Sequence, residues 1–154
     1  MAIKTKNSGI CGPFAIADIL GKTVGSVIAD WVFGYKGYAP FWQIKAMLEK
    51  YGIRYTLCKG KKSKVFDMHG YDFGIARIQW EGNWKHWAEA QQHTHYVALK
   101  RIKGKILVSC DGFGIFEANT TDYLKDGYIT SYIFTTGRAI PPMTKVQGIC
   151  IQET

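Results

Sequence analysis

The first third of the chain has the apolar spacing of amphipathic helices. Apolar residues recur at intervals of three and four positions, the period that places them on one face of a helix. The pattern predicts helices over three segments, at residues 11–21, 24–32 and 41–51. Suitable capping and stop residues flank these segments, namely Gly21, Thr23, Pro40 and Gly52. We therefore expect a helical layer in this part of the chain.

Beyond residue 52 the apolar positions form short runs rich in β-branched and aromatic residues, which are typical of strands. Five such runs lie at residues 53–58, 74–80, 95–102, 105–111 and 128–134. Only Lys103-Gly104 separates the third run from the fourth, which predicts an antiparallel hairpin. Helices followed by a mostly antiparallel sheet make an α+β domain, and with no repeat or linker we expect residues 1–154 to be a single domain. The stretch from Pro141 onward shows no clear pattern.

Composition supports a folded domain without a membrane segment. The chain has 154 residues, 47% hydrophobic and 14% aromatic, which is enough for one sizeable core. No apolar run approaches the ~20 residues of a membrane-spanning helix, so we expect no membrane partner. The first six residues lack the apolar core of an export signal.

The cysteines are scattered, without the paired spacing of a zinc site or a disulfide framework. We therefore expect free thiols in a reducing, cytoplasmic compartment. The four positions are Cys11, Cys58, Cys110 and Cys150.

The formal net charge of +8 is concentrated in two lysine-rich runs, at residues 59–64 and 100–105. Both are expected to form turns between strands, where lysines are solvated and discourage edge pairing. A basic face could instead attract nucleic acid or an acidic protein. Because no nucleic-acid-binding motif accompanies the charge, we favour solvated turns over nucleic-acid binding.

A cysteine stands where a loop-like run leads into the first predicted helix. The sequence Asn-Ser-Gly-Ile precedes Cys11, and Pro13 suits the first turn of the helix that follows. At a helix N-terminus, unpaired N–H groups and the helix dipole favour a thiolate over a thiol. Cys11 is therefore a candidate nucleophile, although a lone cysteine before a helix is more often a small core residue.

A cysteine nucleophile needs a base and a group that orients the base. His95 begins the strand His-Tyr-Val-Ala-Leu, and Asp111 ends the next strand. Pairing of these strands about Lys103-Gly104 would set the two residues nearly opposite each other. A carboxylate beside an imidazole fixes its tautomer and stabilises the imidazolium formed in catalysis. Cys11, His95 and Asp111 together indicate a catalytic triad, although each alone is more often structural.

A zinc site is the alternative interpretation of the histidines. His93 lies two residues before His95, so the pair could bind zinc together with Cys11 or Asp111. No ligand spacing beyond the pair supports this, and we expect no metal or other cofactor.

Three tryptophans surround a predicted exposed loop at residues 81–87 and are candidates to line a substrate groove. They are Trp80, Trp84 and Trp87. Closing the end of a small core is an equally good interpretation of these aromatic side chains.

Several motifs of the chain resemble the papain-like cysteine peptidases. They are the helix start Cys-Gly-Pro-Phe-Ala-Ile-Ala-Asp-Ile-Leu-Gly, the helix end Met-Leu-Glu-Lys-Tyr-Gly, the strand His-Tyr-Val-Ala-Leu and the strand end Asp-Gly. The compact bacterial branch that includes double-glycine leader peptidases is the most similar, and the resemblance spans residues 7–136. It implies a papain-like fold with Cys11 in a cleft between the helices and the sheet.

The resemblance also implies residue roles. Cys11 would be the nucleophile, His95 the general base and acid, and Asp111 the orienting residue. Members of the family carry a Gln before the cysteine that donates to the oxyanion; Thr5 stands at that position here, and Asn7 is the nearest amide. We therefore expect Asn7 to serve the oxyanion. Asp111-Gly112 replaces the Asp-Pro of the family.

These residues predict a thiol hydrolase that cleaves a peptide or isopeptide bond of a protein substrate through a thioester. The same triad can catalyse deamidation, amide hydrolysis or acyl transfer. The rival hypothesis is a catalytically impaired papain-like module whose basic loops bind an acidic protein or nucleic acid. A short chain with the cysteine near its start further suggests a phage or viral origin. The sequence does not indicate an oligomeric state.

Overall fold

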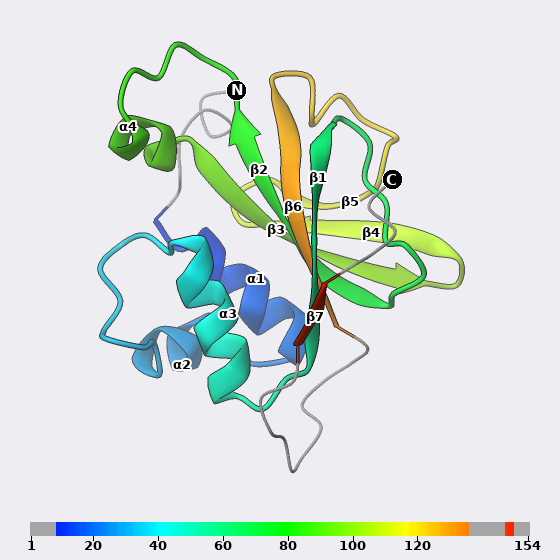
Figure 1. The fold of residues 1–154 in the computed structure, drawn as a ribbon. Helices are drawn as coiled ribbons and strands as arrows, with labels where there is room; N and C mark the ends of the chain where they lie inside the picture. The colour runs from blue at the N-terminus through cyan, green and yellow to red at the C-terminus, as the bar shows by residue number, and fades with distance from the viewer. Residues whose placement is uncertain (1–8, 136–146, 150–154) are drawn as a thin grey trace.

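Helices and a seven-stranded sheet form an α+β arrangement in the computed structural model, which describes residues 9–135 and 147–149 (Figure 1). Helices α1, Cys11–Leu20, α2, Val24–Ala29, and α3, Phe41–Lys50, lie together on one side of the sheet. A fourth short helix, α4, Trp87–Gln92, lies at the end of the sheet and leads into the third strand. The predicted helical layer is confirmed, whereas α4 was not predicted.

Local chemistry sets the ends of the first two helices. Gly21 ends α1 with φ +69°, a left-handed conformation that glycine adopts without a steric penalty. Thr23 caps α2 by accepting the Ser26 N–H at 3.1 Å. The helix stops at Ala29, before the end of the apolar pattern. Trp31 is nevertheless buried and donates its indole N–H to Gln43 at 2.8 Å, so the pattern there reports burial rather than helix.

The described strands form one sheet in the order β5-β4-β3-β2-β6-β1-β7. All neighbours pair antiparallel except β1 and β7, which are parallel. The five predicted strands are present, and β5 and β7 are additional. Their bounds are β1 Tyr55–Ser63, β2 Phe73–Trp80, β3 Thr94–Ile102, β4 Lys105–Cys110, β5 Gly114–Glu117, β6 Gly127–Thr135 and β7 Gln147–Ile149.

One of the two lysine-rich runs is a strand rather than a turn. β1 continues through this run to Ser63 and pairs with β6, with a register shift between Lys59 and Ser63. Lys59 and Lys62 are exposed, so their charges stay in water while the backbone pairs. The prediction of a turn at residues 59–64 is therefore wrong. At the second run, Lys103 and Gly104 both have positive φ, and the predicted two-residue hairpin turn is confirmed.

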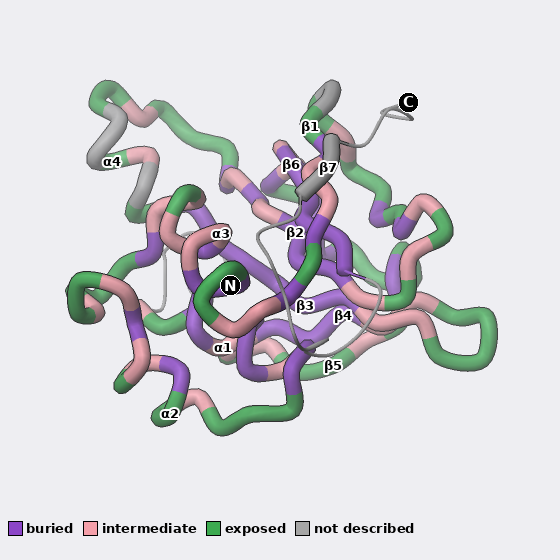
Figure 2. The backbone as a smooth tube through the Cα atoms, turned by 60° about the horizontal axis from the view of Figure 1, so that its bottom comes forward, coloured by how far each residue is buried: buried purple, intermediate pink, exposed green. Residues whose placement is uncertain are grey.

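The sheet separates two hydrophobic cores, because successive side chains of a strand point to opposite faces. On β3, Tyr96 and Ala98 join the core beneath the helices, whereas Val97 and Leu99 join the core on the other face. The buried positions concentrate in α1 and the central strands, and the β3–β4 turn is exposed (Figure 2). Face assignment on β3 therefore decides which core each of its residues enters.

The cysteines are not all free thiols. Cys58 on β1 is buried and disulfide-bonded. Cys11 and Cys110 form no disulfide within the described part of the chain. The expectation of free thiols, on which the reducing compartment rested, is wrong at Cys58, since spacing along the sequence cannot reveal a long-range pairing.

Across residues 9–135 and 147–149, no helix has the length and apolar character needed to cross a membrane.

Gly12 of α1 has no room for a side chain, and its replacement should destabilise the fold. A Cβ at this position would lie 2.6 Å from Ala39 Cβ and 3.1 Å from Ile44 Cδ1. We expect Gly12→Ala to lower the free energy of unfolding by about 1–3 kcal/mol, measured by urea denaturation.

Gly25 of α2 provides the matched control, since a Cβ there would have no atom within 4 Å. Gly25→Ala should leave stability unchanged or raise it by up to about 1 kcal/mol, because alanine is the better helix former. Equal effects of the two substitutions would contradict the close packing of α1.

Candidate functional site

Cys11 is the first residue of α1, as predicted, and its sulfur is buried against β3. The side chain is 1% exposed. Backbone N–H groups of Tyr96 and Gly12 hydrogen-bond to the sulfur. The loop before α3 closes around this point, since the Tyr35 hydroxyl donates to the Gly9 carbonyl at 2.5 Å and the Tyr96 hydroxyl to the Ala39 carbonyl at 2.9 Å. Cys11 is thus fixed beside the peptide group that joins His95 to Tyr96.

Burial dominates the electrostatics of Cys11. It raises the pKa of the thiol to about 12, because a thiolate loses its hydration there. Hydrogen bonds from the Tyr96 and Gly12 backbone lower the pKa, whereas the negative charge of Asp111 raises it further. The backbone N–H groups therefore act in the expected direction, but the expected net preference for a thiolate is wrong. Desolvation outweighs the N–H donors, and the resting group is a neutral thiol.

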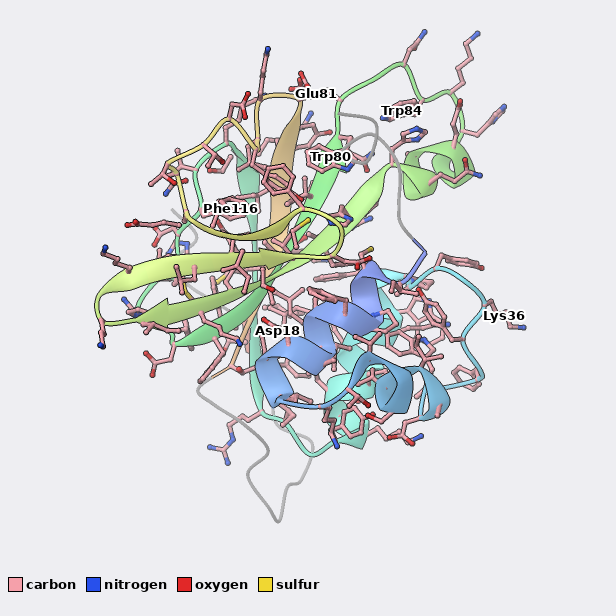
Figure 3. The ribbon with its side chains drawn as sticks, turned by 180° about the vertical axis from the view of Figure 1, so that it is seen from behind. Asp18, Lys36, Trp80, Glu81, Trp84 and Phe116 are labelled. Atoms are coloured by element: carbon pink, nitrogen blue, oxygen red, sulfur yellow. The ribbon has the colours of Figure 1, made fainter. Side chains whose placement is uncertain are left out.

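His95 lies on the face of β3 that points away from the helices. It alternates with Tyr96 and is on the same face as Val97, in the second core. The imidazole is 2% exposed and stacks on the Trp80 ring with centroids 6.2 Å apart. Figure 3 shows Trp80 and Phe116 on one side of β3 and β4, and Asp18 of α1 on the other.

Cys110 is the hydrogen-bonding partner of the imidazole. His95 Nε2 lies 3.1 Å from Cys110 Sγ, which is itself 3.0 Å from the Tyr123 hydroxyl. The other ring nitrogen, Nδ1, is buried and has no hydrogen-bonding partner among the described residues. One edge of the imidazole is thus held by a sulfur, and the other edge meets no polar group among the described residues.

Burial also keeps the imidazole neutral. It lowers the pKa of His95 to about 4, because the imidazolium would be desolvated. The carboxylate of Asp111 acts in the opposite direction by stabilising the protonated ring. At neutral pH the site therefore holds a neutral thiol and a neutral imidazole rather than a thiolate–imidazolium pair.

Asp111 belongs to the same locality but is not the hydrogen-bonding partner of His95. The β3–β4 register pairs Ile102 with Lys105 and Ala98 with Ser109. Continued by two pairs, it would set Asp111 opposite Tyr96, one position from His95, which agrees with the prediction that the two residues lie nearly opposite each other. The Asp111 carboxylate nevertheless acts electrostatically on both Cys11 and His95. The structure therefore gathers the three predicted residues, with a different contact to the imidazole.

The predicted groove tryptophans do not form one surface. Trp80 is 1% exposed and packs in the second core, so the groove assignment is wrong for it. Trp84 is half-buried, stacks on His93 and donates its indole N–H to the Trp80 carbonyl at 2.8 Å. The side chain of Trp87 and the whole of Asn7, the predicted oxyanion donor, lie outside the described residues.

Sequence reasoning missed Cys110 and Tyr123. The signal for Cys110 was available, because counting back from the two-residue turn places Cys110, not Asp111, on the face of His95. Tyr123 carried no such signal, since it lies in an irregular segment between β5 and β6.

No group of three or more His, Cys, Asp or Glu side chains that could hold a metal ion occurs within residues 9–135 and 147–149.

Compared with known proteins, the chain matches no family model and no curated protein sequence. Its activity must therefore be inferred from the chemistry of its own residues.

The buried neutral imidazole should make stability depend on pH. The unfolded chain binds a proton at His95 below about pH 6.5, whereas the folded chain does so only near pH 4. Stability contributed by this residue is complete above the higher value and is lost as the pH falls toward the lower one. We expect a loss of about 3 kcal/mol across this window, measured by denaturation at successive pH values.

His95→Gln should remove that component, whereas His86→Gln, at an exposed site, should retain the wild-type profile. Identical profiles for the two variants would show that His95 is not held neutral by the fold.

The buried thiols should react slowly. Because burial raises the pKa to about 12 for Cys11 and about 11 for Cys110, little thiolate exists near neutrality. At about pH 7.5 we expect iodoacetamide to modify folded protein at least ~100-fold more slowly than a free thiol. Protein unfolded in urea is the control, and peptide mapping identifies the site. A titration midpoint for Cys11 below about 8.5 would contradict this account.

Proposed function

We propose that this chain is a papain-like thiol hydrolase that cleaves a peptide or isopeptide bond, with Cys11 as the nucleophile and His95 as the general base. The proposal rests on the hydrogen bond that the backbone N–H of Tyr96 donates to the Cys11 sulfur. That N–H belongs to the peptide group joining His95 to Tyr96, so one rigid strand positions both the nucleophile and the base.

The unpartnered Nδ1 of His95 supports the same assignment. A general base needs a free lone pair and a fixed orientation. Nδ1 is buried without a hydrogen bond in the described structure, whereas Nε2 is held by Cys110. The ring is therefore oriented from one edge and available to accept a proton at the other. Asp111 adds a negative charge that stabilises the imidazolium once it forms.

The reaction begins from neutral groups. The Cys11 sulfur is not a hydrogen-bonding partner of His95 Nδ1 in the described structure, so the two must approach each other in the substrate complex. As the sulfur then attacks the substrate carbonyl, its proton passes to Nδ1 and a sulfur–carbon bond forms. The imidazolium then gives this proton to the leaving nitrogen as the carbon–nitrogen bond breaks, which leaves a thioester. Water, deprotonated by the same imidazole, cleaves the thioester and restores the thiol. Proton transfer accompanies attack, because no thiolate is formed in advance.

Asn7 remains our prediction for the oxyanion donor. Deamidation, amide hydrolysis and acyl transfer to another nucleophile would use the same steps, and differ in the group that leaves or the acceptor that replaces water.

A second candidate function, a catalytically impaired papain-like module, is favoured by the burial of the site. Cys11 is 1% exposed, and desolvation opposes charge on both the thiol and the imidazole. Exposed lysines of β1 offer a binding surface, where the Lys62 ammonium lies 4.6 Å from the centroid of the Tyr128 ring. An acidic protein or a nucleic acid would be the partner.

Acylation by p-nitrophenyl acetate tests the hydrolase proposal. The wild type should release a burst of p-nitrophenolate, and mass spectrometry should place the acetyl group on Cys11. Cys11→Ala should abolish the burst, and His95→Ala should slow it by about 10²- to 10⁴-fold, as expected for loss of a general base. His86→Ala, which alters an exposed histidine, should retain the wild-type rate.

A burst that survives in Cys11→Ala, or equal rates for the two histidine variants, would overturn the proposal. Retention of the wild type on heparin with a steep salt dependence, in the absence of acylation, would instead support the binding module.

A further inference from the structure

Within the second core, a series of hydrogen-bonding contacts connects the His95 imidazole with Cys110 and Tyr123. The Tyr123 hydroxyl lies 3.0 Å from Cys110 Sγ, and Cys110 Sγ lies 3.1 Å from His95 Nε2. Each of the three residues is less than 5% exposed. Aromatic rings surround Tyr123, with the Phe113 and Phe116 centroids 4.9 and 5.0 Å from its own. Cys110 and Tyr123 are therefore shielded from solvent.

The partners of each group in this series indicate where the protons lie. The Cys110 thiol donates to the carbonyl oxygen of Asp111 at 3.5 Å, so its sulfur is left to accept. A neutral imidazole carries one N–H. Placed on Nδ1, that N–H would be a buried donor without a partner, at a cost of about 1–3 kcal/mol. Placed on Nε2, it donates to Cys110.

We propose that Cys110, supported by Tyr123, is the positioning residue of the base: its sulfur accepts the His95 Nε2–H and thereby leaves Nδ1 as the proton acceptor for Cys11. This rests on the proposed function, in which His95 is the base. Asp111, which lies opposite Tyr96 in the continued register, contributes its charge rather than a hydrogen bond.

The tautomer of His95 is a direct readout of this role. Long-range ¹H–¹⁵N NMR of ¹⁵N-histidine-labelled protein at about pH 7 distinguishes a protonated from an unprotonated ring nitrogen, and at this pH the imidazole of His95 is neutral. The wild type should show Nε2 protonated and Nδ1 unprotonated. Cys110→Ala should give a mixture of the two tautomers. Cys110→Ser, which restores an acceptor, should recover the wild-type pattern.

Tyr123→Phe provides a second test, because it removes the outer hydroxyl while keeping the ring. The variant should fold and should broaden or shift the His95 Nε2 signal. The signals of His86, which is exposed, should remain unchanged in every variant. An Nδ1–H tautomer in the wild type, or a wild-type pattern in folded Cys110→Ala, would overturn the assignment. The wild-type measurement decides even where a variant does not fold.

Acylation measured on the same samples separates this inference from the proposed function. If both hold, Cys110→Ala should slow the p-nitrophenolate burst by at least about tenfold and Cys110→Ser should restore it, since a misplaced tautomer disables the base. The expected tautomer without any burst would refute the hydrolase and leave the positioning of the ring intact. A burst with the Nδ1–H tautomer would refute the positioning role alone.

Discussion

The contact between the N-terminus of α1 and the start of β3 is the constraint on which the site depends. Gly12 allows α1 to approach the loop before α3 more closely than any residue with a side chain would permit. The sulfur of Cys11 accepts hydrogen bonds from backbone N–H groups of both elements, from Gly12 of its own helix and from Tyr96 of β3. Because these are backbone groups on regular elements, the position of the sulfur follows from the packing of the core.

The same packing makes the site electrically neutral at rest. Helix N-termini and backbone N–H groups favour an anion by a modest free energy, whereas removing a thiolate from water costs considerably more. In this fold the desolvation cost is larger than the effect of the N–H groups for Cys11. The cost of desolvating an imidazolium likewise keeps His95 unprotonated. A neutral pair tolerates burial in a way that a separated thiolate and imidazolium would not. Cys11 and His95 are consequently buried in the core as neutral groups.

Local pattern in the sequence was enough for the helical layer, the principal strands and the start of α1 at Cys11. It also predicted that Cys11, His95 and Asp111 lie close together. It failed where tertiary structure decides. A lysine-rich run is part of β1, because its backbone pairs with β6 while Lys59 and Lys62 remain exposed, and Cys58 is disulfide-bonded. The thiol's pKa was misjudged because the degree of burial, unlike the helix end, cannot be seen in the spacing of residues.

The β3–β4 register has a further consequence. A slip of one residue turns every side chain of a strand to the opposite face, so a deletion near the exposed Lys103-Gly104 turn would exchange the thiol of Cys110 for the carboxylate of Asp111 beside the imidazole. The same slip would withdraw Val108 from the second core. The same register therefore determines both which acidic group lies beside His95 and which side chains fill the core of the sheet, so a slip alters both.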